Sequence, residues 1–334
     1  MTTMKTLLGA VAASALAAGA AMAEPGLIID LGGKFDKSFN ESAYNGAQRW
    51  VEDNDGADYL ETELASEAQR EQTMRRMADR GANPVVVLGF ANGSTLEQVA
   101  PDYPETNFVI VDMVVDQPNV QSIVFAEHQG SYLVGMMAAM ASETGTVSFV
   151  GGMDVPLIRK FACGYAQGAK AANPDVEVIA NMTGTTPAAW NDPVKGGELT
   201  RSQISQGSDV VFAAAGGTGV GVLQAAADEG ELAIGVDSNQ NYLHPGNMLT
   251  SMVKRVDNAV YDAFTAAVEG ELQTGIVVKD LSNDGVGVAM DEFNEDLVTE
   301  EMMAAVEEAR AAIESGELEV HDYTSDDSCP ALTF

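Results

Sequence analysis

The sequence predicts an α/β protein with two lobes, each built on a doubly wound parallel sheet. Short apolar runs alternate with amphipathic segments along nearly the whole chain, several runs end in glycine or aspartate, and the alternation falls into two series. Continuous apolar runs are typical of parallel strands, which are buried on both faces and joined by right-handed helical crossovers. At 334 residues the chain is long enough for two domains.

The first series predicts five strands with helices between them. Uninterrupted apolar residues indicate the strands, and apolar residues at intervals of three or four indicate the helices. The expected strands are Leu27–Asp30, Asp58–Leu64, Pro84–Phe90, Phe108–Asp112 and Gln121–Phe125. The expected helices run from Ser38 to about Asp53, Ser66 to Arg80 and Thr95 to Tyr103.

The second series has the same form. A helix rich in small residues, Gly130–Glu143, precedes it and is expected to be buried. The expected strands are Thr146–Val150, Val176–Asn181, Asp209–Ala214 and Ala233–Asp237. The expected helices are Val155–Asn173, Pro193–Gln206 and Gly216–Glu229.

The later segments decide the lobe boundaries. Met248–Met252, the helix Asp257–Glu269 and the strand Gly275–Lys279 are expected to return to the first lobe, while the acidic helix Glu295–Ser315 and a polar tail follow. We therefore expect lobe 1 to comprise residues 24–126 and 246–278, and lobe 2 to comprise residues 127–245 and 279–334. Because no low-complexity linker separates the lobes, the expected hinge consists of crossings near residues 126–129, 240–247 and 280–286.

Residues 1–23 have the features of a secretory signal peptide. Lys5 is their one charged residue, an apolar run follows to Ala20, and Ala21-Met22-Ala23 forms an A-x-A cleavage site. A membrane anchor is the alternative, but the run is short and alanine-rich for a span of about 20 residues. We predict cleavage after Ala23 and export to the periplasm. No cysteine lies near the cleavage site, so we predict no lipid anchor.

The net charge of −33 limits the possible partners. Such an acidic surface repels nucleic acid and anionic membranes, so neither is expected as a partner. The carboxylates concentrate on the predicted helix faces and the tail, which indicates a solvated surface or adaptation to salt.

Cys163 and Cys329 are the two cysteines of the chain. In an oxidising exported compartment, an even number of cysteines makes this pair a disulfide candidate, which would tie the tail to the helix Val155–Asn173. Two free thiols are the alternative.

The stretch from Leu27 to Trp50 is the first candidate for a ligand site. A strand ends at its aspartate, two glycines follow, and ligands of open α/β sheets bind at the carboxyl ends of strands. The candidate residues in this stretch are Asp30, Lys37, Ser38, Phe39 and Asn40. Ser38 stands three residues before Glu41, the spacing of a capping box, and is expected to begin the helix. The alternative is an ordinary strand–helix connection with a glycine turn and a core phenylalanine.

Gly216, Gly217 and Thr218 form a second candidate, because they open a helix directly after a strand that contains Phe212. Backbone N–H groups at such a position can bind an anion or a polar ligand. The glycine spacing does not match the dinucleotide pattern G-x-G-x-x-G, and no P-loop sequence occurs, so a turn with a ligand-facing Phe212 or Thr218 is favoured. Tight packing of helix against strand is the alternative.

Asp237 and Lys254 each lie at the end of a predicted strand and form a third candidate. A carboxylate accepts two O–H hydrogen bonds and an ammonium group donates to the same oxygens, so the pair could hold vicinal hydroxyl groups. The alternative is a helix N-cap at Asp257 and a surface lysine.

Motifs of catalysis and metal binding are absent from the sequence. The three histidines, His128, His244 and His321, are far apart, and no H-E-x-x-H, C-x-x-C or G-x-S-x-G pattern occurs. We therefore expect no metal, no cofactor and no enzymatic activity. His128 and His244 fall in the predicted crossings and could line a cleft between the lobes.

Six motifs, in order along nearly all of the chain after residue 23, are similar to those of a known family. They are Asp30–Asn40, Phe149–Gly152 with Pro156, Asp192–Gly196, Val211–Gly219, Gly235–Gln240 and Ser251–Asp257. On these motifs the chain resembles the basic membrane protein (BMP) family of substrate-binding proteins, and within it the PnrA-like purine nucleoside receptors. The resemblance implies a type I periplasmic-binding-protein fold, in which two lobes close on one ligand and serve an ABC importer.

The resemblance also implies how the base of a purine nucleoside is bound. The purine would lie between Phe39 and Phe212, whose rings stack on either face. Asp112 and Asn40 would contact the edges of the base, and Asp30 would lie nearby.

For the sugar, the resemblance implies that Asp237 and Lys254 hold the ribose hydroxyl groups, with Gly216, Gly217 and Thr218 near the ring. Two positions depart from the family pattern. Asn239 stands where many relatives have an acid, and Trp190 stands where a smaller aromatic residue is common.

We therefore predict a monomeric periplasmic receptor that binds guanosine, adenosine or inosine and delivers it to the permease and ATPase subunits of an ABC transporter. One alternative is riboflavin or a sugar on the same scaffold. A second is an exported nucleoside hydrolase, which would need a crowding of aspartates near the amino terminus that Asp30 and Asp36 do not provide.

Overall fold

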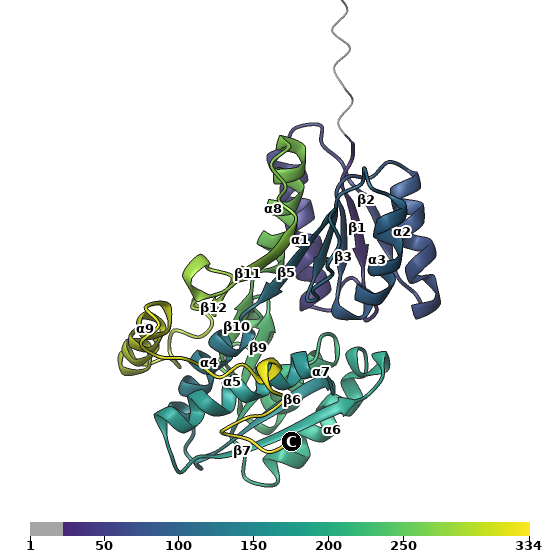
Figure 1. Ribbon diagram of the computed structural model, residues 1–334. Coiled ribbons are helices and arrows are strands. Elements are labelled where there is room, and N and C mark those ends of the chain that lie inside the picture. The colour runs from purple at the N-terminus through teal and green to yellow at the C-terminus, as the bar shows by residue number, and fades with distance from the viewer. Residues whose placement is uncertain (1–22) are drawn as a thin grey trace, which may run out of the picture.

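A computed structural model describes residues 23–334 and contains two α/β lobes, each with a six-stranded sheet (Figure 1). This confirms the predicted fold class. The predicted signal peptide lies outside the described residues except for Ala23. Within residues 23–334, no helix combines the length and the apolar character needed to span a bilayer.

The sheet of lobe 1 is entirely parallel. Across the sheet its strands are β11 (Gly275–Lys279), β5 (Val120–Phe125), β4 (Phe108–Val111), β3 (Val85–Leu88), β1 (Gly26–Ile29) and β2 (Leu60–Glu63). Two helices cover each face: α1 (Phe39–Asp53) and α8 (Val256–Glu269) on one, α2 (Arg70–Asp79) and α3 (Gly93–Val99) on the other. The four central strands, β5, β4, β3 and β1, are buried on both faces, whereas the edge strands β11 and β2 are partly exposed.

The sheet of lobe 2 has one antiparallel strand at its edge. Across the sheet its strands are β12 (Val286–Val288), β10 (Met248–Lys254), β9 (Leu232–Asp237), β8 (Val210–Ala214), β6 (Thr146–Met153) and β7 (Glu177–Gly184). The helices of lobe 2 are α4 (Glu127–Ala141), α5 (Pro156–Ala172), α6 (Pro193–Ile204), α7 (Thr218–Glu229) and α9 (Glu300–Glu314). The edge strand β12 was not predicted, because three residues are too short to show a pattern.

The lobe boundary predicted near residue 246 is wrong. β10 pairs with β9 and with β12, so it belongs to lobe 2, and the chain crosses to lobe 1 only between Lys254 and Val256. Residues 240–247 connect β9 to β10 within lobe 2 and form no crossing. The crossings after β5 and between β11 and β12 agree with the prediction. An apolar run alone does not show which sheet a strand joins.

Strand periodicity divides the core of lobe 1 between the two faces of its sheet. Leu27 and Ile29 of β1 pack towards α1 and α8, whereas Ile28 packs towards α2 and α3. On the first face the rings of Trp50 and Phe264 meet edge to face, with centroids 5.4 Å apart. Helices thus pack on both faces of the lobe 1 sheet.

Cys163 on α5 and Cys329 near the C-terminus form a disulfide, as proposed from the sequence. The bond joins residues 166 positions apart. Closing so long a loop restricts the unfolded chain, which corresponds to about 4–5 kcal/mol of stability in the loop-entropy model.

Reduction is therefore expected to lower the free energy of unfolding by several kcal/mol. Urea denaturation with and without dithiothreitol measures the difference. The variant Cys329→Ser should resemble the reduced protein and should not respond to dithiothreitol; equal stability of reduced and oxidised protein would contradict the expectation.

Candidate functional site

A cavity lies between the lobes, at the carboxyl ends of strands from both sheets. Its empty space is about 620 Å³ when the open mouth is included. The residues lining it from lobe 1 are Asp30, Leu31, Asp36, Phe39, Asn40, Gly89, Phe90 and Asp112. Those lining it from lobe 2 are Leu157, Ile158, Phe161, Trp190, Ala214, Gly216, Val236, Asp237 and Lys254.

The two lobes are in direct contact around this cavity. The Ser38 hydroxyl group of lobe 1 donates a hydrogen bond to the Asp237 carboxylate of lobe 2. The Gln240 side-chain amide donates to the backbone carbonyl of Lys37 at 2.7 Å. These bonds join the loop before α1 to the end of β9, so the two lobes enclose the cavity.

Lys254, at the end of β10, is buried among carboxylates. Its Nζ lies 2.7 Å from Asp112 Oδ2 and 3.0 Å from Glu127 Oε1. Burial alone would lower the pKa of Lys254, but the carboxylates of Asp112, Glu127 and Asp237 outweigh this and raise it. Lys254 is therefore a permanent cation in the cavity wall.

Asp112 and Asp237 each occupy the left-handed backbone region, with φ of 72° and 64°. Aspartate adopts this conformation at a cost, and such residues cluster at ligand sites. Burial raises the pKa of Asp112 to about 6 even though Lys254 opposes the shift, and burial likewise raises the pKa of Asp237. Both carboxylates come from strand ends, as the sequence predicted.

Four aromatic rings line the cavity, two from each lobe. Phe39 and Phe90 belong to lobe 1, and Phe161 and Trp190 belong to lobe 2. Lys254 Nζ lies 5.3 Å from the ring centroid of Phe39 and 5.6 Å from that of Phe161. Phe90 and Trp190 meet across the lobes with centroids 6.5 Å apart. Aromatic side chains of both lobes thus contribute to the cavity wall.

Phe212 is not one of these rings, and its predicted position in the site is wrong. Its side chain is fully buried in lobe 2, where its ring centroid lies 5.4 Å from those of Phe149 and Tyr165. Phe212 stands two residues before the end of β8 and points to the interior, whereas the last residue of the strand, Ala214, lines the cavity.

The glycine segment after β8 contributes one lining residue and a support. Gly216 lines the cavity, but Gly217 and Thr218 do not. The Thr218 hydroxyl group bonds to one backbone carbonyl and one backbone N–H group of residues 189–192, at 2.7 Å in both cases. Thr218 therefore holds the segment that carries Trp190, and its position near a sugar ring stays a prediction.

Asn40 and Asp112 each present a free acceptor. The Asn40 side-chain NH₂ group donates to the carbonyls of Asp30 and Gly33, which leaves its Oδ1 without a partner among the described residues. Asp112 Oδ1 is likewise buried and unpartnered. Asp30 is occupied by a 2.7 Å ion pair with Arg70, so its carboxylate is held at the cavity wall.

Lys37 does not line the cavity. Its side chain is 41% exposed and pairs with Glu41, and only its backbone carbonyl takes part in the contact between the lobes. Lys37 has a φ of 62° in the loop before α1, and its ammonium group pairs with Glu41 in the first turn of that helix.

The predicted capping box at Ser38 is also wrong. The Ser38 side chain bonds to Asp237 and makes no cap hydrogen bond. Ser38 is the N-cap residue, but the Asp36 carboxylate makes the capping contacts in its place, accepting hydrogen bonds of 2.8–3.1 Å from the backbone N–H groups of residues 38, 40 and 41. This frees Ser38 to join the lobes.

Asp36 titrates close to neutral pH. Burial raises its pKa to about 7, although the three backbone donors oppose the shift. Because its pKa is higher in the folded state than in the unfolded chain, protonation of Asp36 favours folding as the pH falls from 8 to 5. The linkage is about 1.4 kcal/mol per unit of pKa difference.

When the pH is lowered from 8 to 5, the free energy of unfolding should therefore rise by about 2–3 kcal/mol more in the wild type than in Asp36→Asn. Burial lowers the pKa of His128 to about 4, so this histidine lowers stability as the pH falls. The effect is the same in the wild type and in Asp36→Asn and cancels when the two are compared. Urea denaturation at the two pH values gives the difference. Parallel pH profiles for the two proteins would contradict the expectation.

Among the polar and aromatic residues of the site, Asp36, Phe90, Phe161 and Glu127 were not predicted from the sequence. Phe90 ends the apolar run that contains β3, and strand ends were the signal used for Asp30 and Asp237. Asp36 lies in a loop, Glu127 is the first residue of α4, and Phe161 lies in the second turn of α5. No local pattern marks any of the three as a site residue. Among residues 23–334, no three histidine, cysteine, aspartate or glutamate side chains are grouped to hold a metal ion.

Comparison with known proteins assigns the family. The family model described as ABC transporter substrate-binding protein PnrA-like matches residues 26–323. This chain belongs to the PnrA-like family. The resemblance drawn from six motifs is confirmed, and the family consists of substrate-binding proteins rather than enzymes.

Curated relatives of this PnrA-like protein cover most of its length. An ABC transporter nucleoside-binding protein, BmpA, from Lactococcus lactis is 32% identical over 316 residues, with 88% of each chain covered. An uncharacterized lipoprotein from Pyrococcus abyssi is 33% identical over 276 residues, covering 78% of this chain and 67% of the relative. The absence of a lipid anchor in this chain stays a prediction.

A solved structure supports the fold of this PnrA-like protein directly. An ABC transporter solute-binding protein from Aeropyrum pernix matches with a TM-score of 0.84 and 28% identity, covering 91% of this chain and 95% of that one. The two-lobed type I periplasmic-binding-protein fold is thereby confirmed. The protein is the ligand-binding component of an ABC transporter system.

Proposed function

We propose that this protein binds a purine nucleoside in the cavity between its lobes and delivers it to an ABC importer. The observation that supports this most is the position of Lys254. A buried ammonium group lies 2.7 Å from Asp112, near Asp237, in a cavity with aromatic rings from both lobes. A ligand suited to it has a flat heterocycle at one end and hydroxyl groups at the other.

The aromatic rings suit the base. Phe39 and Trp190 retain exposed surface and come from opposite lobes, so a purine between them stacks on both faces. Each stacked ring contributes about 1–3 kcal/mol and tolerates different bases. The unpartnered oxygens of Asn40 and Asp112 can accept hydrogen bonds from the N–H groups at the base edge.

Asp237 and Lys254 suit the ribose. A carboxylate that accepts from two hydroxyl groups and an ammonium group that donates to the same oxygens recognise a vicinal diol. A ligand without these hydroxyl groups would leave buried polar groups unpaired, which typically costs 1–3 kcal/mol for each group. The site should therefore reject deoxyribose and free bases.

Delivery follows from the arrangement of the lobes. Closing the lobes brings Ser38 to Asp237 and encloses the ligand, and a transporter can distinguish closed from open receptors. The Lactococcus lactis relative named as nucleoside-binding supports this ligand class. A periplasmic location after cleavage at Ala23, action as a monomer and the absence of catalysis belong to the same proposal.

Isothermal titration calorimetry with guanosine, adenosine and inosine tests the ligand class, with riboflavin and ribose as alternatives. We expect binding to one site for at least one purine nucleoside and no binding of ribose alone. Heat with riboflavin or ribose but with no nucleoside would overturn the proposal. Release of free base from a bound nucleoside would instead assign the protein as a hydrolase.

Ligand binding is also expected to change tryptophan fluorescence. The chain has two tryptophans, of which Trp50 is buried in lobe 1 and Trp190 lines the cavity. A purine stacked on Trp190 should quench its emission. The variant Trp190→Phe should bind without this change, whereas Trp50→Phe should retain it; quenching that persists in Trp190→Phe would contradict the placement of the base.

A further inference from the structure

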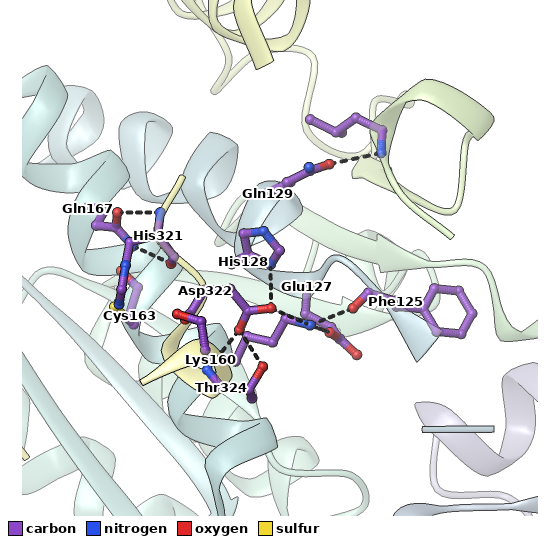
Figure 2. A network of polar contacts seen from close by, with 12 residues as sticks. Phe125, Glu127, His128, Gln129, Lys160, Cys163, Gln167, His321, Asp322 and Thr324 are labelled. Atoms are coloured by element: carbon purple, nitrogen blue, oxygen red, sulfur yellow. Dashed lines mark hydrogen bonds and ion pairs between the residues drawn. The ribbon is translucent and has the colours of Figure 1, made fainter. Parts of the chain in front are cut away.

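A row of buried charges leads from the C-terminus to the lysine of the cavity. The C-terminal strap, residues 317–334, lies beside α5 (Figure 1). Figure 2 shows its Asp322 next to Lys160 of α5, whose Nζ lies 3.3 Å from Asp322 Oδ2 and 3.0 Å from Glu127 Oε2. The other oxygen of Glu127 lies 3.0 Å from Lys254 Nζ. Negative and positive groups thus alternate from the strap to the ligand site.

The inner members of this row are almost fully buried. Lys160, Glu127 and Lys254 are 8%, 1% and 2% exposed. Burial alone would lower the pKa of Lys160, but Glu127 and Asp322 outweigh it and raise the pKa, so Lys160 stays charged. Charges in such surroundings interact strongly with their neighbours, and the position of each depends on the next.

Contacts on both sides of Asp322 hold the strap in place. Cys329 is bonded to Cys163, and the Gln167 side chain makes two hydrogen bonds of 2.9 Å with the backbone of His321. Cys163 and Gln167 lie three and seven positions after Lys160, on the same face of α5. The strap is therefore fixed on the helix face that carries Lys160.

Lys160 also contacts the hinge. Its Nζ donates a 2.7 Å hydrogen bond to the backbone carbonyl of Phe125, the last residue of β5 before the chain crosses between the lobes. The next residue of α5, Phe161, lines the ligand cavity. Lys160 thus joins the strap, the first crossing and the helix that carries one wall of the cavity.

We infer that Asp322 and Lys160 are positioning residues that act through Glu127 to hold Lys254 in place for the ligand. Without the strap carboxylate, Lys160 shifts towards Glu127. The contact between Glu127 and Lys254 is then weakened. Loss of the strap therefore weakens ligand binding although no strap residue lines the cavity. Reduction of the disulfide releases the strap and acts in the same direction. The inference rests on the proposed function for the identity of the ligand.

The test compares Asp322→Asn with Asp327→Asn, which removes the same charge from an exposed position of the strap. Guanosine titration should show affinity reduced about 2- to 30-fold in Asp322→Asn and unchanged in Asp327→Asn. Cys329→Ser should weaken binding as well, which provides a second variant if Asp322→Asn does not fold. Equal affinities in Asp322→Asn, Cys329→Ser and the wild type would overturn the inference.

A double-mutant cycle separates positioning from a general structural effect. In a Glu127→Gln background, Asp322→Asn should cause little further loss of affinity, because the connection to Lys254 is already broken. Independent, additive losses would overturn the inference.

Hydrogen exchange without ligand keeps the test valid if the wild type binds no nucleoside. Absence of nucleoside binding by the wild type would overturn the proposed function but not the role of Asp322 and Lys160. The peptide covering residues 248–256 should exchange faster in Asp322→Asn than in Asp327→Asn, because it contains Lys254 and the crossing to α8. Equal exchange in the two variants would overturn the inference whatever the ligand.

Discussion

Replacing Lys254 with methionine is expected to abolish nucleoside binding and to lower the free energy of unfolding by about 3–5 kcal/mol at pH 7.5. Lys254 lies beside Asp112 and Glu127, and its removal leaves these buried carboxylates without their shared cation. Breaking a buried ion pair at one end is costly because the remaining charge stays desolvated. Calorimetric titration with guanosine and urea denaturation measure the two effects.

The loss of stability in Lys254→Met should be smaller at pH 5. Burial raises the pKa of Asp112 to about 6 even beside Lys254, and without the lysine it should rise further. A carboxyl group whose pKa is raised by folding takes up a proton as the pH falls, which favours the folded state. Lys195→Met, at an exposed position of α6, serves as control. Unchanged affinity in Lys254→Met would remove this residue from the site.

Phe39→Ala is expected to reduce ligand affinity, whereas Phe212→Ala is expected to reduce stability. Phe39 lines the cavity, so its loss should weaken nucleoside binding by about 1–3 kcal/mol with little change in stability. Phe212 is fully buried against Phe149 and Tyr165, so its loss should lower stability by about 3–5 kcal/mol. The folded Phe212→Ala protein should bind with nearly normal affinity.

Titration and denaturation of both variants distinguish the two roles. Trp190→Ala should resemble Phe39→Ala, because it removes the ring that the opposite lobe contributes. Weak binding in Phe212→Ala with unchanged stability would restore the position assigned to it from the sequence. Normal affinity in both Phe39→Ala and Trp190→Ala would contradict the stacking of a base between them.

The sheets and most helices could be predicted from the sequence because buried parallel strands are apolar along their whole length. This pattern located β1, β3, β4 and β8, but it could not assign β10 to a sheet. Strands of both lobes have the same composition, and only their partners differ. The strand β12 has too few residues to show a pattern.

The site residues Asp30, Asp237 and Lys254 could be predicted because topology brings strand ends together, whereas Asp112, which follows β4, was implied by the family resemblance. Phe212 could not be assigned correctly, because residues 212 and 214 lie on the same face of β8, and only the position of the strand end decides that Ala214 reaches the cavity while Phe212 stays in the core. Ser38 appeared to be a helix cap because local spacing carries no information on a partner 199 positions away. Long-range hydrogen bonds of this kind lie outside any local pattern.

Other site residues have no local signal at all. Glu127 belongs to the site because Lys160 of α5 and Lys254 of β10 both pair with it. Phe161 belongs to the site because the N-terminal part of α5 lies beside the cavity. Both depend on how the lobes are packed. Reading of strand ends therefore finds the polar side of the site better than its aromatic side.

The most direct test is a crystal structure of the protein grown with guanosine. The proposal predicts the purine ring between Phe39 and Trp190, with the ribose hydroxyl groups within hydrogen-bond distance of Asp237 and Lys254. A nucleoside bound outside the cavity, or one whose ribose faces away from Lys254, would contradict it.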